Sequence, residues 1–234
     1  MFPFASKLIQ LYKWKLRYVF SAKLNPYHSS RGGVLFIHVP KNAGCSFVES
    51  LYGSDVKSFH FTAQFYRLIN EAKFNAVLKV AVVRDPDERF VSAVNYNRRL
   101  SGDFSDQEFA KKHLSHGSPL DICRVANENE QCFQRICEHT HFRRQVSYVC
   151  DADGEIIVDL LISMNSLSAG LKEIERFFSR DYNITHRNSS QRMQDGFKLS
   201  GRFREFYDAD YQLWDYVSQA EGGFVWVNDP SIQI

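Results

Sequence analysis

The sequence lacks long hydrophobic runs and an excess of either charge sign. None of its apolar stretches approaches the roughly 20 residues that a membrane-spanning helix needs. The N-terminus also lacks the basic, apolar and small-residue order of a signal peptide. The 29 basic and 27 acidic residues leave a formal net charge of +2, whereas nucleic-acid-binding proteins have more numerous and more clustered basic residues. We therefore expect a cytoplasmic protein that binds no nucleic acid and whose anion sites are local.

Cysteine patterns typical of metal sites or disulfide frameworks are also missing. No two cysteines have C-x-x-C spacing and their number is odd: Cys45, Cys123, Cys132, Cys137 and Cys150. The helical zinc motif H-E-x-x-H is absent as well. We expect reduced thiols and no bound metal.

Two familiar nucleotide-binding motifs do not occur. There is no G-x-G-x-x-G, which binds dinucleotides, and no Walker A motif G-x-x-x-x-G-K-[ST], in which the lysine follows the second glycine. These absences argue against a dinucleotide enzyme and against an ordinary kinase or ATPase.

What the sequence does contain is the alternation of strand and helix patterns typical of one α/β domain. Its 234 residues, 44% of them hydrophobic, can bury a full core. Short apolar runs predict strands at 34–37 and 77–83, and a hairpin formed by 146–150 and 156–161. Helices are predicted at 46–51, at 66–74 with Leu68 and Ile69 facing inward, at 86–99, from 105, at 119–137, at 167–178 and across 203–214. We expect a three-layer fold with a central, mainly parallel sheet flanked by helices.

The first 27 residues alternate apolar and basic side chains, which predicts a basic amphipathic helix. Such a helix either packs on the domain, which we favour, or lies on an anionic membrane surface. We assign residues 28–234 to the single globular domain.

The loop after the first predicted strand has the composition of an anion-binding site. It contains Pro40, Lys41, Asn42, Ala43, Gly44, Cys45 and Ser46. Between a buried strand and a helix, its backbone N–H groups and the helix N-terminus converge on one point. Lys41 adds a positive charge and Ser46 a hydroxyl, and Gly44 permits close approach of the backbone to a ligand. We predict that this loop binds phosphate.

A second candidate site follows the strand at 77–83. Arg84 stands at the carboxyl end of that strand, where open α/β sheets bind ligands. Asp85 is a predicted N-cap, Pro86 fits the first helical position and Glu88 completes a capping box. Arg89 is expected in a structural ion pair. Ser92, two turns into the helix, can bind the same anion as Arg84.

Together these segments resemble the paired donor-binding motifs of sulfotransferases that use 3′-phosphoadenosine-5′-phosphosulfate. The resemblance is to carbohydrate sulfotransferases grouped with heparan sulfate 2-O-sulfotransferase. Residues 40–46 resemble the loop P-K-[TN]-A-[GS]-[TC]-S, which holds the 5′-phosphosulfate in that family. Residues 84–92 resemble R-[DN]-P-x-[ED]-R-x-x-S, which holds the 3′-phosphate. The resemblance implies a P-loop-like fold and this nucleotide as co-substrate.

Weaker similarities extend the resemblance over roughly residues 33–217. Residues 59–63 are similar to the segment that carries the family's catalytic histidine, which implies His60 as the base. Residues 141–145 resemble an H-[FW]-x-P-Q motif, 188–190 a late N-x-S motif that implies Ser190 in donor binding, and 207–211 a closing Y-x-x-D-[YF].

The resemblance implies in-line transfer of a sulfuryl group to a hydroxyl of a glycan or glycolipid. Lys41 would stabilise the leaving phosphate, His60 would deprotonate the acceptor, with His141 and His38 as rival bases, and Arg84 with Ser92 would hold the 3′-phosphate. Two alternatives stay open: a P-loop-like kinase or hydrolase, and a catalytically silent protein that binds a nucleotide or glycan. The sequence does not determine the oligomeric state or the acceptor.

Overall fold

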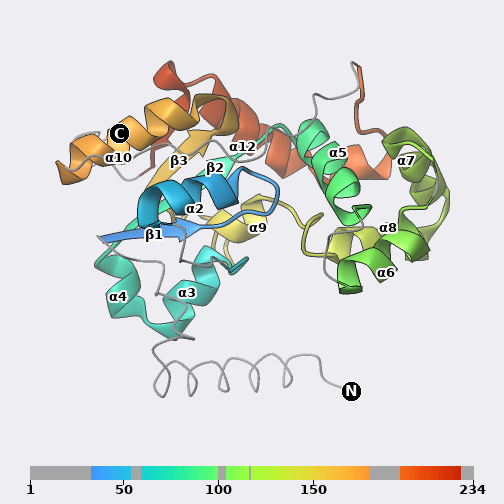
Figure 1. Ribbon diagram of the computed structural model, residues 1–234, viewed down its shortest axis with the longest axis horizontal. Helices are drawn as coiled ribbons and strands as arrows, with labels where there is room; N and C mark the ends of the chain where they lie inside the picture. The colour runs from blue at the N-terminus through green and yellow to red at the C-terminus, as the bar shows by residue number, and fades with distance from the viewer. Residues whose placement is uncertain (1–32, 54–58, 100–103, 116, 180–195, 228–234) are drawn as a thin grey trace.

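A four-stranded sheet forms the centre of the molecule (Figure 1). The computed structural model describes residues 33–53, 59–99, 104–115, 117–179 and 196–227. The strands lie in the order β1 (Val34–Ile37), β2 (Leu78–Val83), β3 (Leu160–Ser163) and β4 (Phe224–Trp226). The first three are parallel, and β4 is antiparallel to β3. The predicted α/β class with a mainly parallel sheet is confirmed.

Helices make up most of the remaining described residues. In chain order they are α2 (Gly44–Tyr52), α3 (Ala63–Ile69), α4 (Glu71–Asn75), α5 (Pro86–Asn97), α6 (Phe104–His113), α7 (Pro119–Glu128), α8 (Glu130–Glu138), α9 (Val146–Val149), α10 (Leu167–Phe178), α11 (Arg202–Phe206) and α12 (Asp208–Ser218). There are also two short 3₁₀ turns. Met164–Ser166 lies between β3 and α10, and Glu221–Gly223 lies between α12 and β4.

Alternating side chains of the strands build a separate core on each face of the sheet. Leu35 and Ile37 point to one face, where they join buried residues of α3, α4, α9 and α12. Val34 and Phe36 point to the other face and pack with α2 and α10. Both faces of the sheet are therefore covered by helices.

A third core lies beside the sheet and, among the described residues, is built by helices and the loops that join them, without a strand. Phe90 of α5 and Phe203 of α11 meet in it with buried residues of α6, α7 and α8. Figure 1 shows α5, α6, α7 and α8 grouped at one end of the molecule. This arrangement agrees with the helices predicted at 86–99, from 105 and at 119–137.

The hairpin predicted for residues 146–161 is wrong. Residues 146–149 form the short helix α9, and a single bridge, Cys150 to Ile156, is all that remains of the pairing. The carboxylate of Asp210 accepts the N–H groups of Gln145 and Val146, at 2.7 and 3.0 Å, and so satisfies donors at the start of this helix. A short apolar run alone does not distinguish a strand from such a buried helix.

Two predicted helices are each divided at an asparagine. Asn70 is extended between α3 and α4 and its side chain accepts the N–H of Lys73, and Asn129 separates α7 from α8 in the same way. Each asparagine ends one helix and caps the next. Leu68 is 47% exposed and does not face inward as predicted, whereas Ile69 is buried as predicted. The predicted last helix is likewise divided, into α11 and α12, at Tyr207.

The start of α5 follows the prediction except at one side chain. Asp85 caps the helix by accepting the N–H groups of Asp87 and Glu88, and Pro86 occupies its first turn. The carboxylate of Glu88 pairs with Nε of Arg84 at 3.2 Å and does not complete the predicted capping box.

Two predictions concern residues outside the described ranges: the amphipathic helix at 1–27 and the donor-binding role of Ser190. Among the described residues, no helix has both the length and the apolar composition needed to cross a bilayer.

Candidate functional site

A pocket of about 230 Å³ lies where the chain leaves the carboxyl ends of β1 and β2. The loop after β1, the first turn of α2 and one face of α5 form most of its wall. Its lining residues include Lys41, Ala43, Gly44, Cys45, Ser46, His60, Arg84, Ser92, Tyr96, Arg99 and His141. The structure thus brings both predicted anion-binding segments and the predicted catalytic histidine to one cavity.

The backbone of the loop after β1 has the form of an anion-binding nest. Lys41 and Ala43 have positive φ angles of 71° and 55°, whereas Asn42 between them does not. Alternation of this kind turns successive N–H groups toward one side. Left-handed geometry at a non-glycine residue costs about 1–2 kcal/mol. The loop holds this geometry directly before the N-terminus of α2, where anions are favoured.

Gly44 is required by the close packing of a histidine. A Cβ atom at this position would lie 1.8 Å from Nε2 of His38. His38 follows β1 and is buried, and its ring centroid lies 4.2 Å from that of His60. The sequence predicted that Gly44 makes room for a ligand, but in the structure the space beside it holds the His38 ring.

Lys41 is the cation of the loop and is half-buried. Its Nζ lies 3.8 Å from the centroid of the Tyr96 ring on α5, a distance at which the ring face attracts the ammonium. Burial, followed by the nearby charge of Arg99, lowers the pKa of Lys41 to about 8. The group is therefore charged at pH 7, and it titrates just above neutrality.

Arg84 joins the two predicted anion-binding segments directly. One of its guanidinium nitrogens donates to the carbonyl oxygen of Lys41 at 3.2 Å. Ser92 lies two turns further along, on the face of α5 that also presents Glu88 and Tyr96 to the pocket. This spacing follows the helical repeat, which places residues four apart on one face.

A buried polar network holds the loop against the sheet. The side-chain amide of Asn42 donates to the carbonyl oxygen of Val82 and to Oε1 of Gln145, both at 2.7 Å. Gln145 in turn accepts the N–H of Arg84 at 3.0 Å and donates to its carbonyl oxygen at 2.8 Å. These bonds fix the positions of the loop and of Arg84 relative to each other, because buried polar groups are costly to leave unpaired.

Arg89 connects the same loop to the helical end of the molecule. Its guanidinium donates to the carbonyl oxygens of Pro40 at 3.1 Å and Arg143 at 2.6 Å. One of its nitrogens lies 4.0 Å from the buried carboxylate of Asp210. The expected structural ion pair is present at this long distance, and the shorter bonds go to backbone carbonyls.

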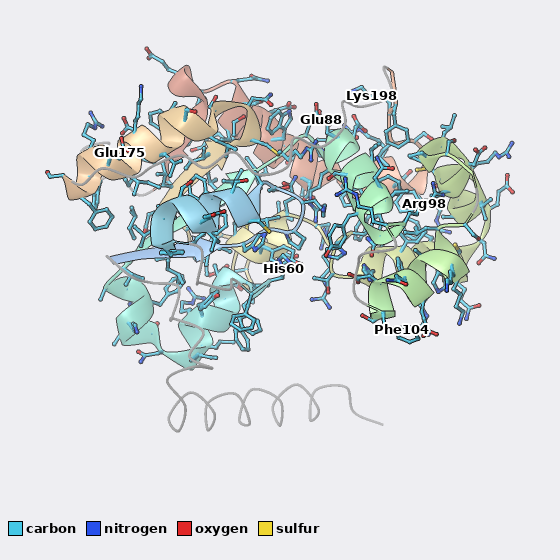
Figure 2. All side chains as sticks on the ribbon, viewed as in Figure 1. His60, Glu88, Arg98, Phe104, Glu175 and Lys198 are labelled. Atoms are coloured by element: carbon cyan, nitrogen blue, oxygen red, sulfur yellow. The ribbon has the colours of Figure 1, made fainter. Side chains whose placement is uncertain are left out.

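Three histidine rings lie side by side along the pocket. Figure 2 shows His60 near the centre of the molecule. Nδ1 of His60 lies 3.1 Å from the carbonyl oxygen of His38. A carbonyl only accepts, so Nδ1 carries the proton and Nε2 keeps its lone pair. Burial lowers the pKa of His60 below its ordinary value, and the ring is neutral at pH 7.

His141 is held in the same tautomer by Asn97 of α5. Nδ2 of Asn97 donates to the carbonyl oxygen of Ala93 at 2.8 Å, so its Oδ1 faces Nδ1 of His141 at 3.3 Å. Nδ1 must then be the donor, and Nε2 is left with its lone pair. Burial is the main reason that the pKa of His141 is lowered to about 3, whereas burial and the neighbouring His60 ring hold the pKa of His38 well below its ordinary value.

Not every predicted site residue lines the pocket. Pro40 and Asn42 lie outside its wall, where they bind Arg89 and Gln145. No role was predicted from the sequence for Gln145, Asp210, Asn97 or Tyr96. Gln145 lies in the segment 141–145 and Asp210 in the segment 207–211, and the family resemblance of these two segments was the signal that could have identified both residues. Nothing in the sequence pattern pointed to Asn97 or Tyr96.

All five cysteines are free, as expected. Cys45 is exposed at the first turn of α2, within the pocket wall. Comparison of the chain with family models, curated proteins and solved structures gave no match.

Proposed function

We propose that this protein is a sulfotransferase that moves a sulfuryl group from 3′-phosphoadenosine-5′-phosphosulfate to a hydroxyl of a glycan or glycolipid, on a P-loop-like fold in the cytoplasm. One observation carries the proposal: the loop of Lys41, the Arg84–Ser92 segment and His60 line a single pocket. A donor with a 5′-phosphosulfate and a 3′-phosphate needs two anion sites, and an acceptor hydroxyl needs a base beside them.

The proposed reaction is an in-line displacement at sulfur. The acceptor oxygen forms a bond to sulfur while the bond from sulfur to the 5′-phosphate oxygen breaks, and the hydroxyl proton passes to Nε2 of His60. Lys41 and the N–H groups of the loop stabilise the charge that develops on the leaving phosphate. Arg84 and Ser92 bind the 3′-phosphate and fix the donor's orientation.

The hydrogen bond to the His38 carbonyl supports His60 as the base. It leaves Nε2 unprotonated, and the ring contributes to the pocket wall. His141 offers the same tautomer from the α8–α9 loop and is the rival. His38 is less suited, because its ring is buried against the backbone of Gly44.

A kinase or nucleotide hydrolase is the enzymatic alternative. Such enzymes hold Mg²⁺ with carboxylates beside the phosphates. Among the described residues that line the pocket, Glu88 is the only acidic one, and it pairs with Arg84. A silent nucleotide- or glycan-binding protein is the third candidate, and only an activity assay separates it from the first.

Two measurements test the proposal. Isothermal titration calorimetry with 3′-phosphoadenosine-5′-phosphate and, separately, with Mg-ATP should show binding of the first and weak or no binding of the second. Transfer of labelled sulfate from the donor to a panel of glycans and glycolipids should yield a labelled product. Preference for Mg-ATP would favour the kinase alternative, and tight nucleotide binding without transfer would favour the silent binder.

The role of His60 is tested by His60→Ala. We expect transfer to fall by about 100-fold or more, the scale of lost general-base catalysis, with the affinity for 3′-phosphoadenosine-5′-phosphate retained. His113→Ala, at the last residue of α6, is the control and should keep full activity. If His60→Ala transfers sulfate at the wild-type rate while His141→Ala does not, the base is His141.

A further inference from the structure

Beside the pocket, two histidines and one aspartate converge from different parts of the helical end. Asp106 lies in the first turn of α6, His139 directly follows α8, and His141 lies in the next loop. One ligand atom from each residue lies within 4.8 Å of the others. The side chains of Asp106 and His139 are only 15% and 16% exposed, and His141 is buried.

The spacing within this cluster is close to that of metal ligands. Nε2 of His139 lies 3.3 Å from Oδ1 of Asp106. In a tetrahedral zinc site with bonds of about 2.0–2.2 Å, neighbouring ligand atoms are roughly 3.3–3.6 Å apart. This pair already has the required separation, and a modest shift of His141 completes the set.

The surroundings hold the rings in place. The ring of His139 stacks on Phe109 of α6, with centroids 3.9 Å apart and planes 19° apart. Phe109 is three residues after Asp106, so one face of α6 presents both the carboxylate and the ring that supports His139. Nδ1 of His139 makes only a long, 3.4 Å contact with the backbone N–H of His141. Coordination through Nε2 would move the ring proton to Nδ1, give up that contact, and replace the hydrogen bond from Nε2 to Asp106 with bonds from both groups to the ion.

Asn97 serves as the outer partner that metal-binding histidines commonly have. Its Oδ1 accepts a hydrogen bond from Nδ1–H of His141, which leaves the lone pair on Nε2 of that ring available to a metal ion. Two imidazoles and one carboxylate suit divalent transition metals rather than Mg²⁺ or Ca²⁺. Three protein ligands also leave a coordination position open.

We infer that Asp106, His139 and His141 form a binding site for a divalent transition-metal ion such as Zn²⁺, at the edge of the pocket. The inference does not depend on the proposed function. His141 belongs both to the pocket wall and to this cluster, so a bound ion adds positive charge and an open coordination position beside the bound ligand.

Calorimetric titration of the full chain with ZnCl₂ in a non-chelating buffer tests this site. We expect one equivalent to bind, and His139→Gln and Asp106→Asn each to weaken binding at least tenfold. Both substitutions keep a hydrogen-bonding side chain, and circular dichroism verifies that they fold. His113→Gln, on the same helix α6, and Cys45→Ser, which removes the exposed thiol, are the controls and should bind Zn²⁺ as the wild type does.

Co²⁺ provides a second measurement, because its visible absorption reports the ligands around the ion. We expect a Co²⁺ spectrum in the wild type and in both controls that is absent in His139→Gln. Wild-type protein that binds no Zn²⁺ would overturn the inference. It would equally be overturned if His139→Gln and Asp106→Asn bound Zn²⁺ as tightly as the wild type, or if only Cys45→Ser lost binding.

Discussion

The charge of Lys41 contributes, with those of Arg84 and Arg99, to the positive potential of the pocket. Lys41 has no carboxylate partner among the described residues, and its ammonium faces the Tyr96 ring. Burial and the positive charge of Arg99 both disfavour its protonated form. An anion bound beside Lys41 has the opposite effect and raises its pKa.

Anion affinity should therefore depend on pH. The pKa of Lys41 is about 8 in the free protein, so the ammonium is lost as the pH rises through that value. The affinity for 3′-phosphoadenosine-5′-phosphate should be nearly constant from pH 7 to the pKa and then fall, by up to about tenfold per pH unit. Calorimetry from pH 7 to 9.5 measures this dependence.

Lys41→Arg is the matched control for this titration, because arginine stays charged throughout the range. The variant should show little loss of affinity above pH 8. If the wild type is equally insensitive to pH, Lys41 does not carry the charge that binds the nucleotide.

At the scale of elements, helix α2 can begin where it does because its first residue has no side chain. The ring of His38 occupies the space where a Cβ at Gly44 would stand. The contact between the end of β1 and the start of α2 is therefore made by the backbone of Gly44 and the ring of His38, and it sets the distance between the loop after β1 and the histidines.

Gly44→Ala should destabilise the protein although alanine favours helices. The gain in helix propensity is about 1 kcal/mol, whereas overpacking a filled site costs typically 1–3 kcal/mol. Because the overlap involves the ring itself, we expect a net loss in the free energy of unfolding, measured by urea denaturation.

A double-mutant cycle identifies the cause of that loss. With His38→Ala in the background, Gly44→Ala should cost less than in the wild type, since the ring that it overlaps is gone. Equal costs in both backgrounds would show that the strain arises elsewhere.

At the scale of the whole molecule, Arg89 links the sheet to the helical end. Its side chain is 2% exposed, and the guanidinium donates to the carbonyls of Pro40, in the loop after β1, and Arg143, in the loop after α8. Lysine has a single charged nitrogen and does not reproduce this planar set of donors.

Arg89→Lys should lower the free energy of unfolding by about 3 kcal/mol or more, the cost of breaking a buried charged network. The variant should also bind 3′-phosphoadenosine-5′-phosphate more weakly, because the loop after β1 loses its support. Arg135→Lys, at an exposed position of α8, is the control and should change neither quantity. Wild-type stability in Arg89→Lys would mean that Arg89 does not hold the sheet and the helical end together.

The sequence by itself determined the features that depend on neighbours along the chain. The strand at 34–37, the loop that follows it, and the Asp85–Pro86 start of α5 were all predicted from local spacing and agree with the structure. Strand periodicity, helix caps and strand-to-helix loops are set by side chains within a few residues of one another, so a single sequence contains the necessary information.

Only the tertiary structure decided which distant residues meet. Asn42 and Gln145, which share a hydrogen bond, are 103 positions apart. The N–H of Val146, at the start of helix α9, donates to the carboxylate of Asp210, which is 64 positions away. The gathering of Asp106 with His139 and His141 likewise depends on how α6 packs beside the end of α8. Such contacts arise when apolar faces pack together, and the same apolar pattern along the chain is compatible with many partners.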